Sequence, residues 1–154
     1  MIARQAAEAL NRLTKGFTVL CVTGPRQSGK TTLAKATFPD KPYLSLEDPD
    51  IARLAKEDPL GLLDGYRNGL ILDEALAVPE ILAYMKTSVD ADPRPGKYIV
   101  TGSQQFGLLA GVPESLAGRA AFLTPLPFSI TELGCGIRAV RLRIVPSSTR
   151  ESEH

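Results

Sequence analysis

At residues 24–31 the chain reads Gly24-Pro25-Arg26-Gln27-Ser28-Gly29-Lys30-Thr31, which fits the pattern G-x-x-x-x-G-K-[ST]. An apolar run over residues 17–23 comes directly before it, and a helix-like stretch follows. A strand before and a helix after are the context that separates a phosphate-binding loop from a chance match. With average residue usage, the four fixed positions match in a chain of this length on the order of one time in 200. The sequence therefore predicts a nucleotide-binding loop.

The residue types in this loop suit a concentrated negative charge. Gly24 and Gly29 allow a positive φ and a close approach of the backbone to a ligand. The loop amides and the N-terminus of the following helix then form an anion nest. We expect Lys30 to reach the β- and γ-phosphates and the Thr31 hydroxyl to ligate Mg²⁺. The predicted nucleotide-binding residues are Gly24, Pro25, Arg26, Gln27, Ser28, Gly29, Lys30, Thr31 and Thr32.

Two alternatives qualify this interpretation of the loop. A plain glycine-rich turn between a strand and a helix is possible, but a turn alone requires neither Lys30 nor Thr31. Arg26 is also open, because a solvated or structural arginine fits its position as well as a phosphate contact does.

A second stretch, over residues 70–74, reads Leu-Ile-Leu followed by Asp73 and Glu74. An apolar run that ends in two carboxylates is typical of a buried parallel strand whose carboxyl end opens into a ligand crevice. We expect Asp73 to hold Mg²⁺, directly or through water, and Glu74 to act as general base on the attacking water. The alternative is a strand followed by an acidic helix N-terminus, where carboxylates are favoured by the helix dipole.

The remaining pattern alternates strands with helical stretches, which predicts an α/β domain with a parallel sheet. Strands are expected at 17–23, 43–46, 69–73, 97–101 and 120–123. Helices are expected at 2–14, 29–38, 49–57, 59–66, 78–90, 105–110 and 113–118.

Composition narrows the class of protein further. A chain of 154 residues is most simply one domain, and its net charge of +1 gives no field that would recruit nucleic acid or membrane. It has no apolar stretch near 18 residues and no signal-peptide core, so no membrane association is expected. Cys21 and Cys135 are expected to be reduced thiols of a cytoplasmic protein. His154 is the only histidine, which argues against a zinc site.

These residues together resemble a known family, the prokaryotic AAA-type P-loop ATPases that carry an uncharacterised C-terminal domain. The matching landmarks are, in order, residues 24–33 (GPRQSGKTTL), 44–49 (LSLEDP), 71–74 (ILDE), 99–103 (IVTGS), 115–119 (SLAGR) and 125–129 (PLPFS). The resemblance covers residues 1–133. It implies a three-layer P-loop NTPase sandwich around a parallel five-stranded sheet of order 5-1-4-3-2, and ATP hydrolysis with Mg²⁺.

The resemblance also implies roles for three residues outside the two motifs. Ser103 or Gln104 follows the fourth strand, where such ATPases keep a polar group that bonds the attacking water or a γ-oxygen. Arg119 precedes the fifth strand, where ring-forming relatives place an arginine finger that acts on a neighbouring subunit. A strand-end polar residue and a surface arginine are the alternatives.

The chain departs from the family after residue 133. Relatives continue into a helical lid and a further domain, whereas residues 134–154 have no helical amphipathicity. We therefore expect an AAA-type ATP-binding core over 1–133 and a short tail that is poorly ordered or is not family sequence. Without the lid, nucleotide affinity and turnover should be reduced.

Two other functions compete with an ATPase. A small P-loop kinase needs no water-activating glutamate, so the adjacent Asp73 and Glu74 argue against it. A nucleotide-dependent interaction module would bind ATP with little or no turnover. A protein client is left undefined. DNA binding is possible for such a family, but no recognition helix or basic-aromatic pattern supports it.

Overall fold

The computed structural model describes residues 2–24, 29–102, 119–125 and 140–144. Its elements, in chain order, are α1 (Ile2–Leu13), β1 (Val19–Thr23), α2 (Lys30–Thr37), β2 (Tyr43–Ser45), α3 (Pro49–Glu57), α4 (Pro59–Asp64), β3 (Leu70–Asp73), the 3-10 helix η1 (Ala75–Ala77), α5 (Ile81–Ala91), β4 (Tyr98–Gly102), β5 (Ala120–Pro125) and β6 (Val140–Ile144). The helices predicted at 105–110 and 113–118 lie outside the described residues.

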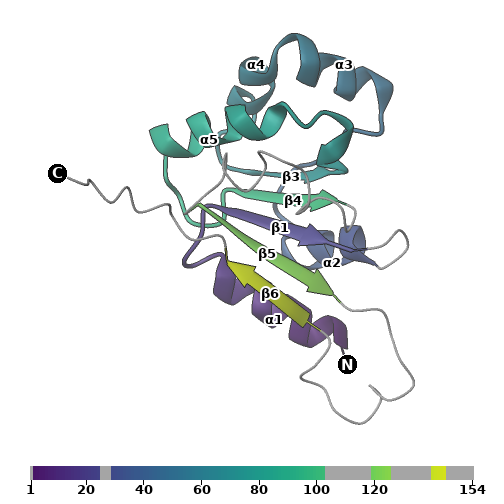
Figure 1. The fold of residues 1–154 in the computed structure, drawn as a ribbon, viewed down its shortest axis with the longest axis vertical. Helices are drawn as coiled ribbons and strands as arrows, with labels where there is room; N and C mark the ends of the chain where they lie inside the picture. The colour runs from purple at the N-terminus through teal and green to yellow at the C-terminus, as the bar shows by residue number, and fades with distance from the viewer. Residues whose placement is uncertain (1, 25–28, 103–118, 126–139, 145–154) are drawn as a thin grey trace, which may run out of the picture.

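The strands form one sheet of order β2-β3-β4-β1-β5-β6 (Figure 1). The first five are parallel, with Val19 opposite both Tyr98 and Ala120, and with Ile71 opposite both Tyr43 and Ile99. This is the predicted order 5-1-4-3-2 written from the other edge, so the predicted fold class is confirmed.

The sixth strand was not predicted. β6 pairs antiparallel with β5, from Ala121 opposite Ile144 to Pro125 opposite Val140. Residues 140–144 read Val-Arg-Leu-Arg-Ile, an alternation of apolar and charged residues with the two-residue period of a strand. The segment has no helical periodicity, and its strand-like alternation spans only five residues. Residues 134–139 and 145–154 of the tail lie outside the described residues.

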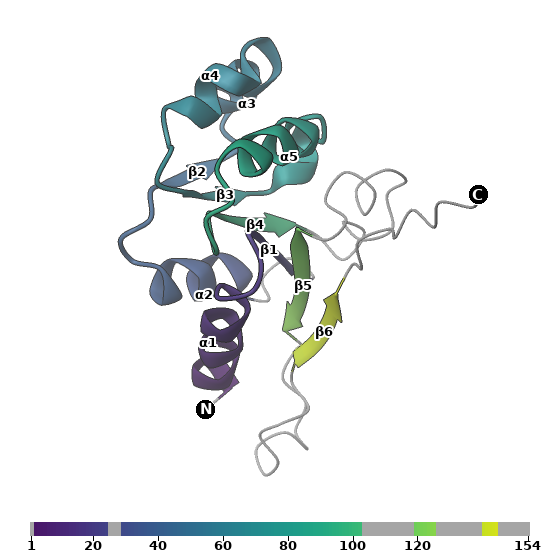
Figure 2. The ribbon, with the colours of Figure 1, turned by 90° about the vertical axis from the view of Figure 1, so that its left-hand side faces the viewer.

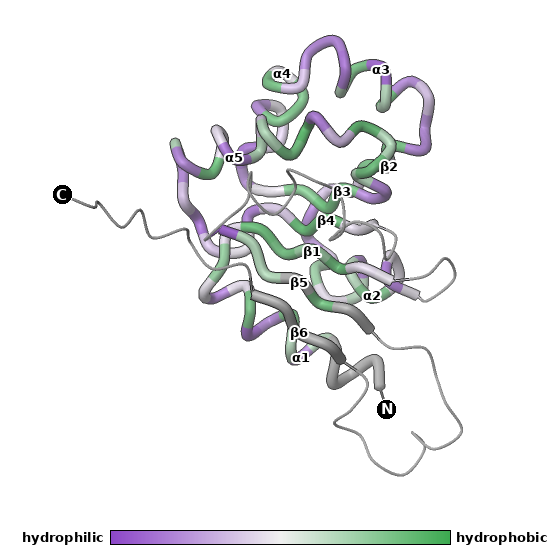
Figure 3. Tube along the Cα trace, viewed as in Figure 1, coloured by the Kyte–Doolittle hydropathy of each residue, from purple (hydrophilic) through white to green (hydrophobic). Residues whose placement is uncertain are grey.

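Helices cover both faces of the sheet, which makes three layers (Figures 1 and 2). α1 and α2 pack on one face, where Leu10 and Ala34 meet Leu20, Ile71 and Ile99. On the other face, α3, α4, η1 and α5 pack together against alternate residues of the same strands. Consecutive residues of β1 therefore enter opposite cores, and β1, β3 and β4 are buried at every position. Figure 3 shows the same pattern, with hydrophobic strands inside and hydrophilic residues concentrated in the outer helices.

The boundaries of the helices follow local capping chemistry. α3 and α4 each begin with a proline, and the preceding aspartates, Asp48 and Asp58, accept hydrogen bonds from Asp50 N and Gly61 N. The helix predicted at 78–90 instead begins at Ile81, because Val78, which follows η1, has a non-helical φ of −137°. Within the described part of the chain, no helix has the length and apolar character needed to cross a bilayer.

Candidate nucleotide and metal site

The candidate site lies at the carboxyl edge of the sheet, where β1, β3 and β4 end side by side. Gly24, directly after β1, donates its backbone N–H to the carbonyl of Gly102 at the end of β4, 3.2 Å away. β3 ends between β2 and β4 with Asp73, and Glu74 follows it. Open parallel sheets bind their ligands at this edge, beyond the carboxyl ends of the strands.

Gly29 begins the helix after the loop in a left-handed conformation, with φ 78° and ψ 12°. Its carbonyl accepts the Leu33 N–H at 2.8 Å, which closes the first turn of α2. Lys30, Thr31 and Thr32 follow in that turn, and Thr32 is exposed. The positive φ is the reason for a glycine at this position. Pro25, Arg26, Gln27 and Ser28 lie outside the described residues.

The Lys30 side chain is buried at the centre of the site, with 5% of the residue exposed. Its Nζ donates to the Gly24 carbonyl at 3.4 Å and lies 3.3 Å from Glu74 Oε1. A buried ammonium needs such partners because desolvation of an unpaired charge is costly. The two motifs that lie far apart in the sequence are thus joined through one lysine.

Asp73 is the acceptor on which three hydroxyl groups converge. Thr31 Oγ1 donates to Asp73 Oδ1 at 2.9 Å, Thr101 gives a short hydrogen bond to the same oxygen, and the Tyr43 hydroxyl donates to Oδ2 at 2.6 Å. Burial alone would raise the pKa of Asp73, but these hydrogen bonds and the charge of Lys30 bring the pKa below its ordinary value. Asp73 is therefore a carboxylate at neutral pH.

Tyr43 reaches this carboxylate from the edge strand β2. Burial, the hydrogen bond to Asp73 and the negative charge of Asp73 raise the pKa of Tyr43 to about 12. Lys35 Nζ lies over the Tyr43 ring, 3.8 Å from its centroid, in a cation–π geometry. The phenol therefore stays protonated and acts as a hydrogen-bond donor to Asp73.

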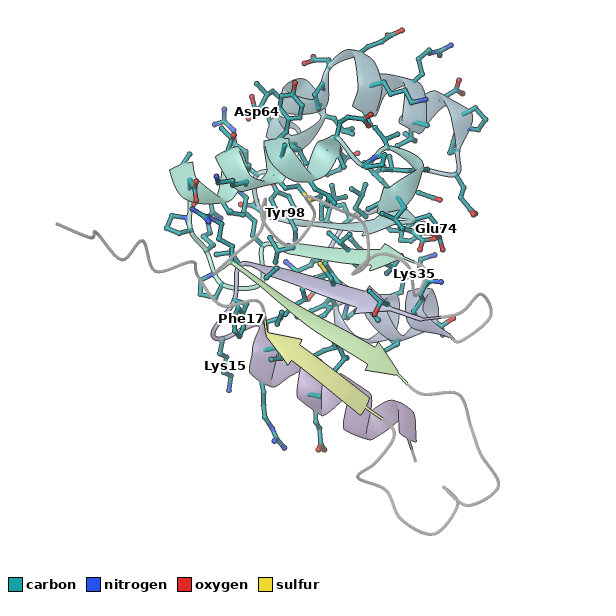
Figure 4. The ribbon with its side chains drawn as sticks, viewed as in Figure 1. Lys15, Phe17, Lys35, Asp64, Glu74 and Tyr98 are labelled. Atoms are coloured by element: carbon teal, nitrogen blue, oxygen red, sulfur yellow. The ribbon has the colours of Figure 1, made fainter. Side chains whose placement is uncertain are left out.

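Glu74 has φ 53° and ψ 51°, and it is the one non-glycine residue with positive φ in the described part of the chain. Its backbone N–H donates to Thr101 Oγ1 at 3.1 Å. Left-handed backbone costs about 1–2 kcal/mol for a residue with a Cβ. Strain of this kind gathers at functional sites and is held there by the surrounding structure. Figure 4 shows Glu74 and Lys35 at the same end of the sheet.

The oxygen donors of this site fit Mg²⁺. Mg²⁺ is usually bound through one or two protein oxygens together with substrate phosphates and water, rather than by an all-protein cage. Thr31 and Asp73 supply a hydroxyl and a carboxylate 2.9 Å apart. No group of three or more His, Cys, Asp or Glu side chains gathers among the residues that the structure describes, so a metal cage of that type is absent there.

Arg119 lies at the other edge of the sheet. It directly precedes β5, and its carbonyl accepts from Val19 N at 3.0 Å and from Thr18 Oγ1 at 3.1 Å, at the amino end of β1. Its Nε is 2.5 Å from Asp90 Oδ1 on α5. The fold therefore does not bring Arg119 to the candidate site of its own chain. Ser103 and Gln104 lie outside the described residues.

A family profile described as an AAA domain matches residues 16–134, which include the loop, Asp73, Glu74 and β1 to β5. The chain belongs to this family. The match covers well over half of the sequence, and the AAA domain so defined contains every described residue of the candidate site.

Curated relatives of this AAA domain include uncharacterized proteins from Mycobacterium bovis and Mycobacterium tuberculosis. Each is 33% identical over 134 residues, which is 85% of this chain and 30% of the relative. The chain therefore spans about a third of the length of the curated relatives it matches. Among solved structures, a DnaC helicase loader has a TM-score of 0.47 at 18% identity, covering 75% of this chain and 81% of that chain. A DNA replication initiation factor has a TM-score of 0.45 at 19% identity, covering 75% and 39%.

Sequence reasoning missed two residues of the site, Tyr43 and Thr101. Both lie on the strands that flank β3, where Ser45 pairs with Asp73 on one side and Val100 pairs with Leu72 on the other. The predicted strand order already placed these strands beside β3. Thr101, a polar residue near the carboxyl end of β4, could therefore have been predicted. Tyr43 begins β2 and reads as an ordinary strand residue.

Proposed function

We propose that this AAA domain binds ATP with Mg²⁺ and hydrolyses it to ADP and inorganic phosphate. The observation that carries the proposal is a pair of contacts at the carboxyl edge of the sheet: Thr31 donates a hydrogen bond to Asp73, and Lys30 forms an ion pair with Glu74. ATP is favoured over GTP because the chain has no guanine-selective N-K-x-D run.

Lys30 and Thr31 bind the polyphosphate in this proposal. The Lys30 ammonium, held by the Gly24 carbonyl at the mouth of the loop, interacts with the β- and γ-phosphates. The Thr31 hydroxyl donates its hydrogen bond to Asp73, which leaves its oxygen lone pairs available to the metal. Mg²⁺ supplies charge neutralisation at the phosphate oxygens when it is bound.

Glu74 acts as the general base. Its side chain has 21% of its surface exposed, so one carboxylate oxygen can contact a water molecule while Oε1 stays paired with Lys30. Its backbone is held by the bond from its N–H to Thr101. The Glu74 carboxylate takes a proton from the water that attacks the γ-phosphorus. The bond from the γ-phosphorus to the oxygen that bridges to the β-phosphate breaks, so ADP is the leaving group and inorganic phosphate is the second product.

The remaining residues act around this centre. Ser103 or Gln104 donates a hydrogen bond to the attacking water or to a γ-oxygen. Arg119 contributes only in a homo-oligomer, as a guanidinium beside the nucleotide of a neighbouring subunit. We further propose residues 1–133 as the ATP-binding core, to whose sheet residues 140–144 of the tail add β6. We also propose a cytoplasmic location and a protein client.

The decisive experiment measures nucleotide binding and phosphate release on the same preparations. Lys30→Ala should abolish binding of ATP. Glu74→Gln should bind ATP as the unmodified protein does and release at least about 100-fold less phosphate, since loss of a general base typically removes two to four orders of magnitude.

Matched controls come from α3, which carries the same residue types on its exposed surface. Lys56→Ala and Glu57→Gln make the same chemical changes away from the carboxyl edge and should alter neither binding nor turnover. Equal phosphate release in all variants would refute the mechanism. A phosphorylated acceptor in place of free phosphate would indicate a kinase. Binding without turnover in the unmodified chain would indicate an interaction module.

A further inference from the structure

Both oxygens of the Asp73 carboxylate are engaged by protein donors. Oδ1 accepts from Thr31 and Thr101, which belong to α2 and β4. Oδ2 accepts from the Tyr43 hydroxyl at 2.6 Å. The donor to Oδ2 comes from β2, the outermost strand on that side of the sheet. Neither sequence motif includes Tyr43, and the proposed hydrolysis assigns it no role.

Tyr43 is itself held firmly in place. Its backbone is in register with Ile71, two residues before Asp73. Lys35 Nζ sits 3.8 Å from the ring centroid, on the same α2 helix that supplies Thr31. The hydroxyl is therefore fixed from two elements, the strand beside Asp73 and the helix that carries the metal-binding hydroxyl.

A carboxylate without such a partner rotates easily about its terminal torsion, which has a broad, roughly two-fold profile. Hydrogen bonds to Oδ1 alone leave Oδ2 free to swing toward a cation. The Tyr43 hydroxyl removes that freedom, because a bond to a charged acceptor is lost when Oδ2 turns away. Asp73 is thereby kept with one oxygen on Thr31 and the other on Tyr43.

This restraint distinguishes between divalent cations. Ca²⁺ takes six to eight oxygen ligands in flexible geometry and often binds a carboxylate through both oxygens. Mg²⁺ requires near-octahedral geometry and keeps several waters, so it needs no second carboxylate oxygen. A carboxylate whose second oxygen is already bonded to a phenol suits the smaller ion.

We propose that Tyr43 is a positioning residue that holds Asp73 in a one-oxygen role and so favours Mg²⁺ over Ca²⁺ at the nucleotide site. The inference rests on the proposed function, because it concerns the metal that accompanies the nucleotide. It adds a determinant of metal choice that lies outside the phosphate loop and outside the Asp73-Glu74 pair.

The test is Tyr43→Phe, which keeps the ring under Lys35 and removes only the hydroxyl. Affinity for a slowly hydrolysed ATP analogue is measured by titration in EDTA, in Mg²⁺ and in Ca²⁺. Affinity in EDTA should stay within about twofold, because the loop residues are untouched. The gain in affinity on adding Mg²⁺ should fall about 10-fold relative to the gain with Ca²⁺, the loss expected for one hydrogen bond to a charged group.

Tyr98→Phe is the matched control. Tyr98 is also a strand tyrosine with a 2.6 Å hydroxyl bond, to Ser88, but it is fully buried and lies at the start of β4 rather than beside Asp73. It should leave the ratio of Mg²⁺ to Ca²⁺ gain unchanged. An unchanged ratio in Tyr43→Phe, or an equal fall with both ions, overturns the positioning role while the proposed function stands. No binding by the unmodified chain under any metal condition overturns both.

Discussion

The amino and carboxyl edges of the sheet each carry a lysine, a tyrosine hydroxyl and a carboxylate, but these groups are paired differently at the two edges. At the amino edge, buried Lys97 donates to Ser88 at 3.1 Å and lies 3.7 Å from Asp92, while Ser88 also bonds Tyr98. At the carboxyl edge, donors from three elements converge on the single carboxylate of Asp73. Figure 4 places Tyr98 away from the end of the sheet that carries Glu74 and Lys35.

Backbone conformation separates the two edges as well. At the amino edge the positive φ values before β3 and β4 belong to glycines, Gly69 at 111° and Gly96 at 69°. At the carboxyl edge Glu74 carries a side chain at φ 53°. The amino edge thus avoids strain and joins strands to α5, whereas the carboxyl edge tolerates strain to hold charged groups. We infer that the first edge serves stability and the second serves chemistry.

Gly69→Ala should give the largest effect on stability. A Cβ at this position would lie 2.4 Å from the Lys97 carbonyl oxygen and 2.7 Å from Lys41 Nζ, at a φ that other residues rarely adopt. We expect a loss of about 3 kcal/mol in the free energy of unfolding, measured by urea denaturation, because both strain and overpacking apply. Nucleotide affinity of the folded protein should stay within about twofold.

Gly16→Ala is the control for that change, because a Cβ there meets no atom within 4 Å. It should be close to neutral in the same assay. A loss of nucleotide affinity in Gly69→Ala that exceeds its unfolded fraction would contradict the separation of the two edges.

Asp73→Asn should give an intermediate effect that depends on pH. At pH 7 the variant loses charge-assisted hydrogen bonds, with an expected cost of about 2 kcal/mol in unfolding free energy and loss of metal-dependent nucleotide binding. The pKa of Asp73 is lowered in the folded state, so its contribution is present above the unfolded value near 3.9 and is lost as pH falls through the folded value. The stability gap to the unmodified protein should therefore narrow toward pH 3.

Asp40→Asn provides the matched change at an exposed aspartate, and it should show no comparable gap at pH 7. Urea denaturation at several pH values measures both variants. A gap for Asp73→Asn that stays constant from pH 7 to pH 3 would show that the ionised carboxylate does not stabilise the fold.

The sequence predicts this fold well because its strands are buried on both faces. β1, β3 and β4 are therefore continuous apolar runs between turn residues, and such runs are visible without tertiary information. The family resemblance then supplied the strand order. β6 was missed because a single short segment of alternating apolar and charged residues does not show which strand it pairs with. The strand at 120–123 was predicted, but its antiparallel pairing with residues 140–144 is known only from the fold.

The candidate site was predicted in part for a related reason. Lys30, Thr31, Asp73 and Glu74 belong to local motifs with fixed spacing, so their types and positions are sufficient to identify them. Tyr43 acts through a contact between neighbouring strands, 30 residues from Asp73 in the chain. The positive φ of Glu74 also has no signature, because nothing local requires left-handed backbone at a glutamate.

The smallest effect is the most diagnostic of strain at the carboxyl edge. Glu74→Ala and Glu74→Gly both delete the side chain and its ion pair with Lys30, so they differ only in the conformations open to the backbone. At ordinary φ, alanine stabilises a protein by about 0.5–1 kcal/mol relative to glycine. At φ 53° the order should invert, with Glu74→Gly more stable than Glu74→Ala by about 1 kcal/mol.

Gly29→Ala tests the same rule from the other direction, at a left-handed residue with open space for a Cβ, and should lose about 1 kcal/mol. Neither Glu74 variant should release phosphate, because both lack the general base. The glycine variant would then be the more stable of two equally inactive proteins. The opposite order of stability would mean that Glu74 is not strained in solution, and the contrast between the two edges would then rest on side chains alone.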